Sequence, residues 1–122
     1  MTDCIKTLET LGSYGKRTKF SYTGSIQEGV VLCQPGNPPV DAPVFAKALE
    51  YFAGKSVYGG FSEDDPTRGG FGEWLQKESP HLNRQKLTPR HGSFAAAILC
   101  AEGGVRSELR GNAVVLHFPS NS

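Results

Sequence analysis

Apolar residues recur at helical spacing in three stretches of the C-terminal two-thirds of this chain. The first helix is predicted between Asp41, a cap residue followed by proline in the first turn, and Gly54, a stop signal. A short second helix is predicted from the apolar face of residues 71–75, and Ser79-Pro80 is expected to end it. The apolar faces of these two helices are expected to form part of the core.

The third helix and the segment after it carry the clearest local signals. Thr88-Pro89 combines an oxygen cap with proline at the first helical position, and two glycines end the helix near residue 102. Gly111-Asn112 then predicts a two-residue hairpin turn. The expected register pairs Leu109 with Val114, Ser107 with Leu116 and Val105 with Phe118 on an apolar face, and Arg110 with Ala113, Glu108 with Val115 and Arg106 with His117 on a polar face.

The first forty residues give weaker signals. Three apolar residues at helical spacing predict a short helix over 5–11, and two β-prone runs predict strands at 16–22 and 29–34. Prolines mark residues 34–43 as a loop, and residues 56–61 read as a short strand interrupted by glycines. The predicted organisation is therefore an N-terminal extension over 1–40, a folded unit over 41–118 and a tail over 119–122.

The fold class expected from this pattern is α+β: a small three-helix unit with a C-terminal β-hairpin, preceded by an N-terminal segment with short strands. The order helix, strand, helix, helix, hairpin over residues 41–118 resembles the winged helix-turn-helix superfamily at the level of architecture. The resemblance implies that Thr88–Glu102 is the recognition helix and that Arg110–Ala113 is the tip of the wing. The connection Ser79–Leu87 is longer than the usual turn of that motif, which leaves the angle between the second and third helices open.

Ten residues are expected to form one buried core. They combine the helical and alternating positions described above: Phe45, Leu49, Phe52, Trp74, Leu75, Phe94, Ile98, Leu109, Leu116 and Phe118.

The composition limits the classes of protein to which this chain can belong. The chain has 122 residues, of which 38% are hydrophobic and 20% charged, and this suits one globular domain. No apolar run approaches the roughly 20 residues that span a bilayer, and no signal peptide is recognised, so no membrane partner and a cytoplasmic location are expected. Cys4, Cys33 and Cys100 are odd in number and far apart, which predicts reduced thiols rather than a disulfide or zinc site.

Charge is distributed unevenly along a chain with a net charge of +1. Residues 77–122 carry six basic and three acidic groups, whereas residues 41–76 carry three basic and six acidic groups. The basic last third favours an anionic partner, and together with the winged-helix resemblance it predicts a small DNA-binding protein without enzymatic activity, cofactor or metal. An ordinary solvated surface explains the same charges.

The residues expected to contact duplex DNA fall into three groups. Cations around the third helix and hairpin would contact phosphate, the first turn of that helix would read bases, and a second cluster near the N-terminus would add nucleic-acid contacts. Ser93 and Ala97 are expected on the exposed face of the third helix. The phosphate-contacting set is Arg84, Lys86, Arg90, Arg106 and Arg110, the base readers are His91 and Ser93 with Asn112 at the wing tip, and the second cluster is Lys16, Arg17 and Lys19.

Two alternatives remain open. The chain could be a protein-interaction module or inhibitor that uses the winged-helix surface or the Gly-rich acidic loop Ser62–Gly72, and a homodimer is one form this could take. It could also be a metal-dependent nuclease that uses the acidic run 63–65, although no strand-borne acid and lysine accompany it. The three histidines are too dispersed in sequence to predict a metal triad.

Overall fold

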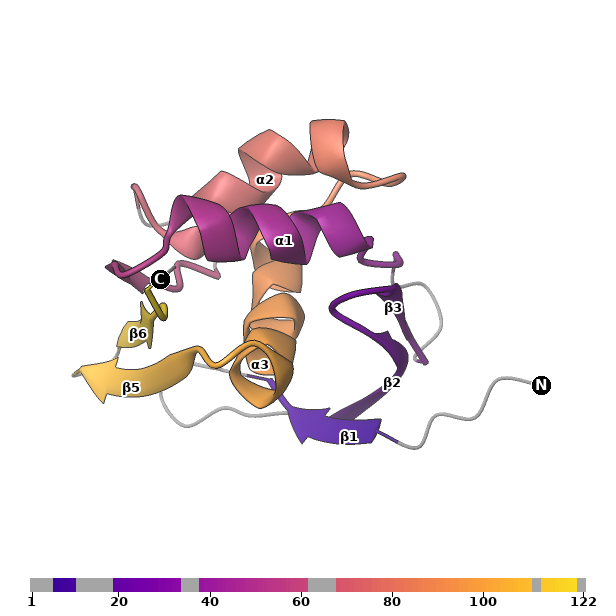
Figure 1. Cartoon of the computed structure of the whole chain (residues 1–122), viewed down its shortest axis with the longest axis horizontal. Coiled ribbons are helices and arrows are strands. Elements are labelled where there is room, and N and C mark those ends of the chain that lie inside the picture. The colour runs from indigo at the N-terminus through magenta and orange to yellow at the C-terminus, as the bar shows by residue number, and fades with distance from the viewer. Residues whose placement is uncertain (1–5, 11–18, 34–37, 62–67, 111–112, 121–122) are drawn as a thin grey trace.

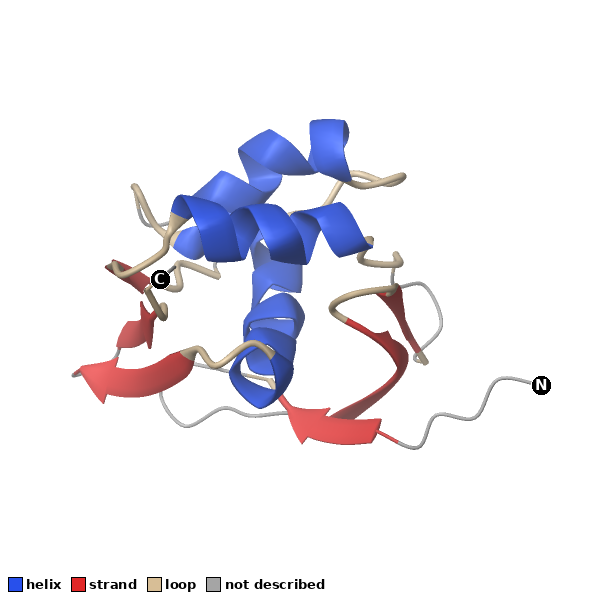
Figure 2. Cartoon of the chain, viewed as in Figure 1, coloured by secondary structure: helices blue, strands red, loops and turns tan. Residues whose placement is uncertain are grey.

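The computed structural model describes residues 6–10, 19–33, 38–61, 68–110 and 113–120. These form three α-helices and two small antiparallel sheets, so the chain has the α+β fold expected from its sequence. Helix α3 stands in the middle of the molecule with one sheet on each side, and helices α1 and α2 lie together across its end (Figures 1 and 2). No helix in these ranges is long and apolar enough to cross a bilayer.

The first sheet consists of β1 (Lys6–Glu9), β2 (Lys19–Ser25) and β3 (Gly29–Leu32), in that order. The two predicted strands are thus confirmed, but the helix predicted over 5–11 is wrong. Three apolar residues are too few to distinguish helix from strand, and pairing with β2 decides the matter by placing Leu8 opposite Phe20. Gly24 has a φ of +92°, and a Cβ there would lie 2.1 Å from the Gly29 carbonyl oxygen, so the β2–β3 turn requires glycine.

Helices α1 (Ala42–Tyr51) and α2 (Phe71–Leu82) lie side by side. Asp41 precedes α1 as predicted but makes no side-chain cap hydrogen bond. The prediction that Ser79-Pro80 ends α2 is wrong, because the helix continues through Pro80 to Leu82. Buried Asn83 closes the helix: its backbone N–H donates to the Ser79 carbonyl at 2.8 Å.

Asn83 also joins the segment before α1 to the segment after α2. Its side-chain amide donates to the carbonyls of Pro39 at 2.9 Å and Gln85 at 2.7 Å, while its Oδ1 accepts from the Asp41 backbone N–H at 2.6 Å. A buried amide with this many partners is fully satisfied, so it fixes the start of α1 against the end of α2.

The second sheet has the order β4–β6–β5, with β4 at Ser56–Tyr58, β5 at Arg106–Arg110 and β6 at Ala113–His117. The predicted hairpin register between β5 and β6 is confirmed at all five strand pairs. Its amphipathicity is not as predicted, because every residue of the edge strand β5 is exposed, including Leu109 at 47%. The middle strand β6 supplies the buried side chains instead, Val115 among them.

Helix α3 (Gly92–Glu102) follows a short 3-10 turn at Pro89–His91, so helical structure extends over most of the predicted range. All five residues from Ala95 to Leu99 are buried, which covers every side of the helix. The first sheet covers one side, where the rings of Phe20 and Phe94 meet edge to face with centroids 5.0 Å apart. The expectation that Ala97 lies on an exposed face is therefore wrong.

One hydrophobic cluster draws on both sheets and all three helices. Of the ten expected core residues, only Leu109 lies outside it: Phe45, Phe52, Leu75, Ile98, Leu116 and Phe118 are buried, and Leu49, Trp74 and Phe94 pack against the cluster while partly exposed.

The shared cluster predicts that residues 6–32 unfold together with the rest of the chain. Phe20→Ala should lower the free energy of unfolding by about 3–5 kcal/mol, because a fully buried ring against α3 is lost. Urea denaturation followed by circular dichroism and tryptophan fluorescence measures this. Val31→Ala, at a 51% exposed position of the same sheet, is the matched control and should change stability by less than about 0.5 kcal/mol. Two separate transitions would show instead that the N-terminal segment folds independently.

Candidate functional site

Near the C-terminus of α3, the carboxylate of Glu102 binds groups of the first sheet and its turn, an arrangement that we call the carboxylate clamp. Glu102 accepts hydrogen bonds from the Tyr22 hydroxyl, the Ile26 backbone N–H at 3.2 Å and Lys6 Nζ at 3.4 Å. Burial alone would raise the pKa of Glu102, but these donors outweigh burial and lower the pKa below its ordinary value. Burial and the Glu102 carboxylate together raise the pKa of Tyr22. The clamp thus fastens the first sheet to the helix that was expected to read DNA.

Several residues of the predicted DNA-contacting set make contacts within the protein. Arg84 binds Asp41 through Nε at 2.9 Å and Nη2 at 2.7 Å, and its backbone N–H donates to the same carboxylate at 2.6 Å. Arg84 is the main cause of the lowered pKa of Asp41. Arg110 pairs with Glu108 at 3.2 Å. Both arginines are exposed, but their charge is already balanced.

The two predicted base readers also have structural roles. His91 Nδ1 accepts from the Thr88 backbone N–H at 3.1 Å, as the return contact of a capping box. Ser93 Oγ donates to the Arg90 carbonyl at 2.9 Å. Both contacts shape the start of α3, where Gly92 is buried.

The remaining predicted cations are exposed. Lys86 and Arg90 precede α3, Arg106 begins β5, and Lys19 begins β2. The eleven residues of α3, about 16 Å at roughly 1.5 Å per helical residue, lie between Arg90 and Arg106 along the chain. Lys16, Arg17 and Asn112 lie outside the described residues, as does most of the acidic loop Ser62–Gly72.

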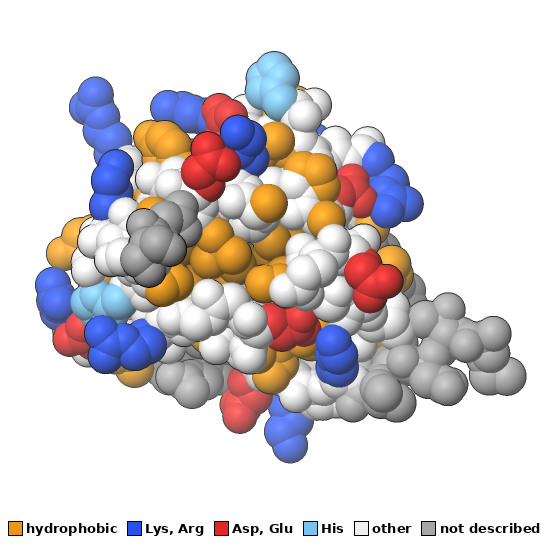
Figure 3. All heavy atoms as spheres, viewed as in Figure 1, with side chains coloured by type: hydrophobic (Ala, Val, Ile, Leu, Met, Phe, Trp, Pro, Cys, Tyr) orange, Lys and Arg blue, Asp and Glu red, His pale blue; other side chains and the backbone are white. Residues whose placement is uncertain are grey.

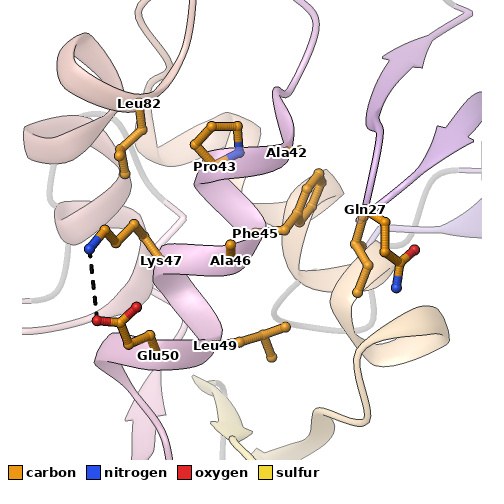
Figure 4. A pocket seen from close by; sticks show the side chains of 10 residues that line it. Gln27, Ala42, Pro43, Phe45, Ala46, Lys47, Leu49, Glu50 and Leu82 are labelled. Atoms are coloured by element: carbon orange, nitrogen blue, oxygen red, sulfur yellow. Dashed lines mark ion pairs between the residues drawn. The ribbon is translucent and has the colours of Figure 1, made fainter.

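A shallow apolar groove crosses the outer face of α1. It has a volume of about 610 Å³. On one side it is bordered by Ile26 and Gln27 of the β2–β3 turn, and on the other by Leu82 of α2 (Figure 4). Its floor follows α1 for more than two turns, and its lining from that helix is Ala42, Pro43, Phe45, Ala46, Lys47, Leu49 and Glu50.

The surroundings of this groove mark it as a distinct surface. Hydrophobic side chains gather in the middle of the face viewed in Figure 3, and charged side chains surround them. Next to it lies a second hollow, between α1 and α2, where exposed Tyr51 stacks on Trp74 with centroids 6.1 Å apart. Lys47 and Glu50 border both hollows and pair with each other at 3.7 Å. Apolar and aromatic surface rimmed by charges is typical of protein interfaces.

A chain of three polar side chains lies on the outer face of the second sheet. Ser56 Oγ lies 2.7 Å from His117 Nδ1, and His117 Nε2 lies 2.6 Å from Glu108 Oε1. Sequence reasoning missed this trio, because its members are separated by 61 and 9 positions. The predicted hairpin register did contain a signal, since it placed His117 diagonally from Glu108 on the polar face.

No group of three potential metal ligands occurs within the described ranges. The acidic run 63–65 falls outside them, so the nuclease reading stays a prediction. The expectation of three reduced cysteines is wrong for Cys33, which is disulfide-bonded. Cys100 is a free thiol, whose pKa is raised by burial.

Comparison of the chain with protein-family models, with curated proteins and with solved structures finds no match in any of the three.

The carboxylate clamp at Glu102 makes the free energy of unfolding depend on pH in the acid range. Glu102 gives a stabilising contribution that is complete above its ordinary pKa of 4.5 and is lost as pH falls through the lower folded-state pKa. Glu102→Gln should reduce the free energy of unfolding at neutral pH by about 1–3 kcal/mol, because a charged hydrogen-bond acceptor is lost. It should also flatten the dependence of stability on pH below 4.5. Urea titrations of both proteins across this range measure both effects, and equally steep curves would contradict the role of the clamp.

Proposed function

We propose that this chain is a protein-interaction module, and that the groove on the outer face of α1 binds an amphipathic helix of a partner protein. The observation that carries the proposal is an exposed, apolar groove of about 610 Å³ on a chain whose third helix is buried on every side over Ala95–Leu99.

The shape and lining of the groove favour a helix as the occupant. Ala42 and Ala46 lie one turn apart in its floor, and such small side chains let another helix approach closely. Gln27, Lys47 and Glu50 provide a polar rim for the solvated face of the incoming helix. A strand is a poorer fit, because the edge of β3 that lies toward α1 is already occupied. There the backbone of Val30 pairs with that of Val40, just before α1.

A displayed library of amphipathic helical peptides tests the proposal. Selected peptides should bind the full chain at micromolar concentration in isothermal titration calorimetry. Ala46→Glu should weaken this binding at least roughly tenfold, about 1.4 kcal/mol, because it places an unpaired charge against apolar side chains. Since position 46 is solvent-exposed in the free protein, the melting temperature should remain nearly unchanged.

Ala101→Glu is the matched control, since Ala101 is an exposed alanine on another helix, away from the groove. It should leave peptide affinity unchanged. Peptides that bind wild type and Ala46→Glu equally well, or a library that yields no binder, would reject the groove as the docking surface.

A second candidate function is binding to duplex DNA in the manner of a winged-helix protein. The element order α1, β4, α2, α3, β5, β6 agrees with the resemblance that suggested it, and the exposed cations Lys86, Arg90 and Arg106 favour it. None of these three cations forms an ion pair with another described residue.

This candidate predicts a shallow salt dependence. With three free cations instead of the original five, the slope of log K against log salt should be roughly −3 or less steep, at about −0.9 per phosphate contact. Arg106→Ala should reduce the slope by roughly one unit, whereas Arg84→Ala should leave it unchanged because Arg84 is engaged by Asp41. Fluorescence anisotropy with labelled duplex DNA measures both. Failure to bind at low salt and micromolar protein would reject DNA binding without affecting the groove proposal.

A further inference from the structure

The outer face of the second sheet holds a serine, a histidine and a carboxylate in a continuous hydrogen-bonded chain. Ser56 Oγ and His117 Nδ1 are 2.7 Å apart, and His117 Nε2 and Glu108 Oε1 are 2.6 Å apart. Each distance is within the range of a good hydrogen bond. From this geometry we propose that Ser56 is a nucleophile that takes the acyl group of activated carboxylic esters, with His117 as its general base and Glu108 as a positioning residue.

The register of the sheet brings the three residues together. His117 on β6 lies directly opposite Ser56 on β4, and Glu108 on β5 lies opposite Val115, two residues before His117 on the same face. Directly opposed and diagonal residues on one face are the pairs whose side chains reach one another across an antiparallel sheet. The imidazole therefore sits in the middle strand with one partner on each neighbouring strand.

The charge state of Glu108 determines the direction of the hydrogen bonds. The hydrogen bond from His117 is the main cause that lowers the pKa of Glu108, with Arg110 as a further cause, so this carboxyl is anionic at neutral pH and can only accept. His117 Nε2 then carries the proton, which leaves Nδ1 as an acceptor for the Ser56 hydroxyl. A base that is itself oriented by a third group is the arrangement that activates serine nucleophiles.

Charged groups of β5 surround His117. Glu108 accepts from its Nε2, and Arg106 lies directly opposite it. Arg110 pairs with Glu108 on the same face. From β4 the imidazole faces the uncharged hydroxyl of Ser56.

Ser56 is open to a substrate. It is exposed, whereas its base His117 is only 24% exposed and so is held in place. β4 is an edge strand whose odd-numbered residues bond to β6, as in the Gly59 N–H to Val114 carbonyl bond, so the Ser56 backbone N–H faces the outer edge. This N–H is a donor beside the reacting hydroxyl. Tyr58, on the same face and 46% exposed, offers apolar surface to an acyl chain.

The proposed step balances as an acyl transfer. Ser56 Oγ bonds to the acyl carbon and gives its proton to His117 Nδ1, while the bond from the acyl carbon to the leaving oxygen breaks. The leaving group departs as an alcohol or phenolate, and the imidazolium returns its proton to it or to water. Water can later hydrolyse the acyl-serine ester. This reactivity goes beyond the non-enzymatic function expected from the sequence and is independent of the α1 groove.

Incubation of the full chain with p-nitrophenyl acetate tests the proposal. Release of p-nitrophenolate should accompany transfer of an acetyl group to Ser56, located by peptide mass spectrometry. Ser56→Ala should abolish this labelled site, and His117→Asn should slow its acetylation roughly 100-fold, the usual scale of a general base. Ser107→Ala is the matched control, because Ser107 is exposed on the opposite face of the same sheet, and it should react like wild type.

Glu108→Gln tests whether Glu108 positions His117 or only stabilises the fold. Loss of the anionic acceptor for His117 Nε2 should lower kcat for acetylation of Ser56 and leave KM unchanged. The melting temperature should stay nearly unchanged, since all three side chains lie on the surface of the sheet. Equal acetylation of Ser56 in wild type and His117→Asn would overturn the proposal, as would acetyl groups confined to lysines or an unchanged kcat in Glu108→Gln.

Discussion

The need to bury α3 on every side dominates this structure. A helix normally buries one stripe and leaves the opposite face to solvent, but Ala95–Leu99 form a run of five consecutive buried residues. Such a helix is stable in water only when other elements surround it. Helix α2 covers its start, the first sheet covers one side through Phe20, and the hairpin covers the other. The alanines allow this close packing because they add little volume between neighbouring elements.

This burial decides where the chain can meet other molecules. With the middle of α3 buried, two of the accessible surfaces in the described part of the chain carry the features discussed above: the outer face of α1 and the outer face of the second sheet. The first is apolar and recessed, and the second carries ordered polar side chains. Some of the charge that might attract nucleic acid is already balanced within the fold, most clearly where Asp41 holds Arg84. The surface chemistry therefore favours recognition of a protein segment over recognition of a phosphate backbone.

Local sequence signals predicted the local structure well. Gly111-Asn112 and the alternation around it gave the correct register of β5 and β6, because a tight turn leaves the two strands few ways to pair. The exposure of α3 was predicted wrongly at Ala97, since alanine fits an exposed face and a crowded core equally well. Only packing against the first sheet distinguishes the two environments, and the sequence signal for that sheet was weak. The apolar residues over 5–11 have helical spacing, yet residues 6–9 pair with β2 as a strand.

Contacts between distant residues could not be read from the sequence. Arg84 was expected to contact phosphate because it lies just before the third helix, yet Asp41, 43 positions away in the sequence, binds it. The same holds for Ser56 and His117, which become neighbours only once β4 joins the hairpin. Asn83 is a third case, a buried polar residue whose side chain bonds to three other residues. Each depends on tertiary geometry and not on spacing.

The exposed edge strand β5 has a consequence for how the protein behaves when concentrated. An unpaired strand edge is a template on which a second molecule can add its own strand and begin an ordered aggregate. In β5 the outward positions alternate as Arg106, Glu108 and Arg110. If two copies paired antiparallel about Glu108, carboxylate would meet carboxylate and each Arg106 would meet an Arg110. Such like-charge contacts oppose that pairing, so the same side chains that form the polar face of the hairpin also help to keep copies of the protein apart at high concentration.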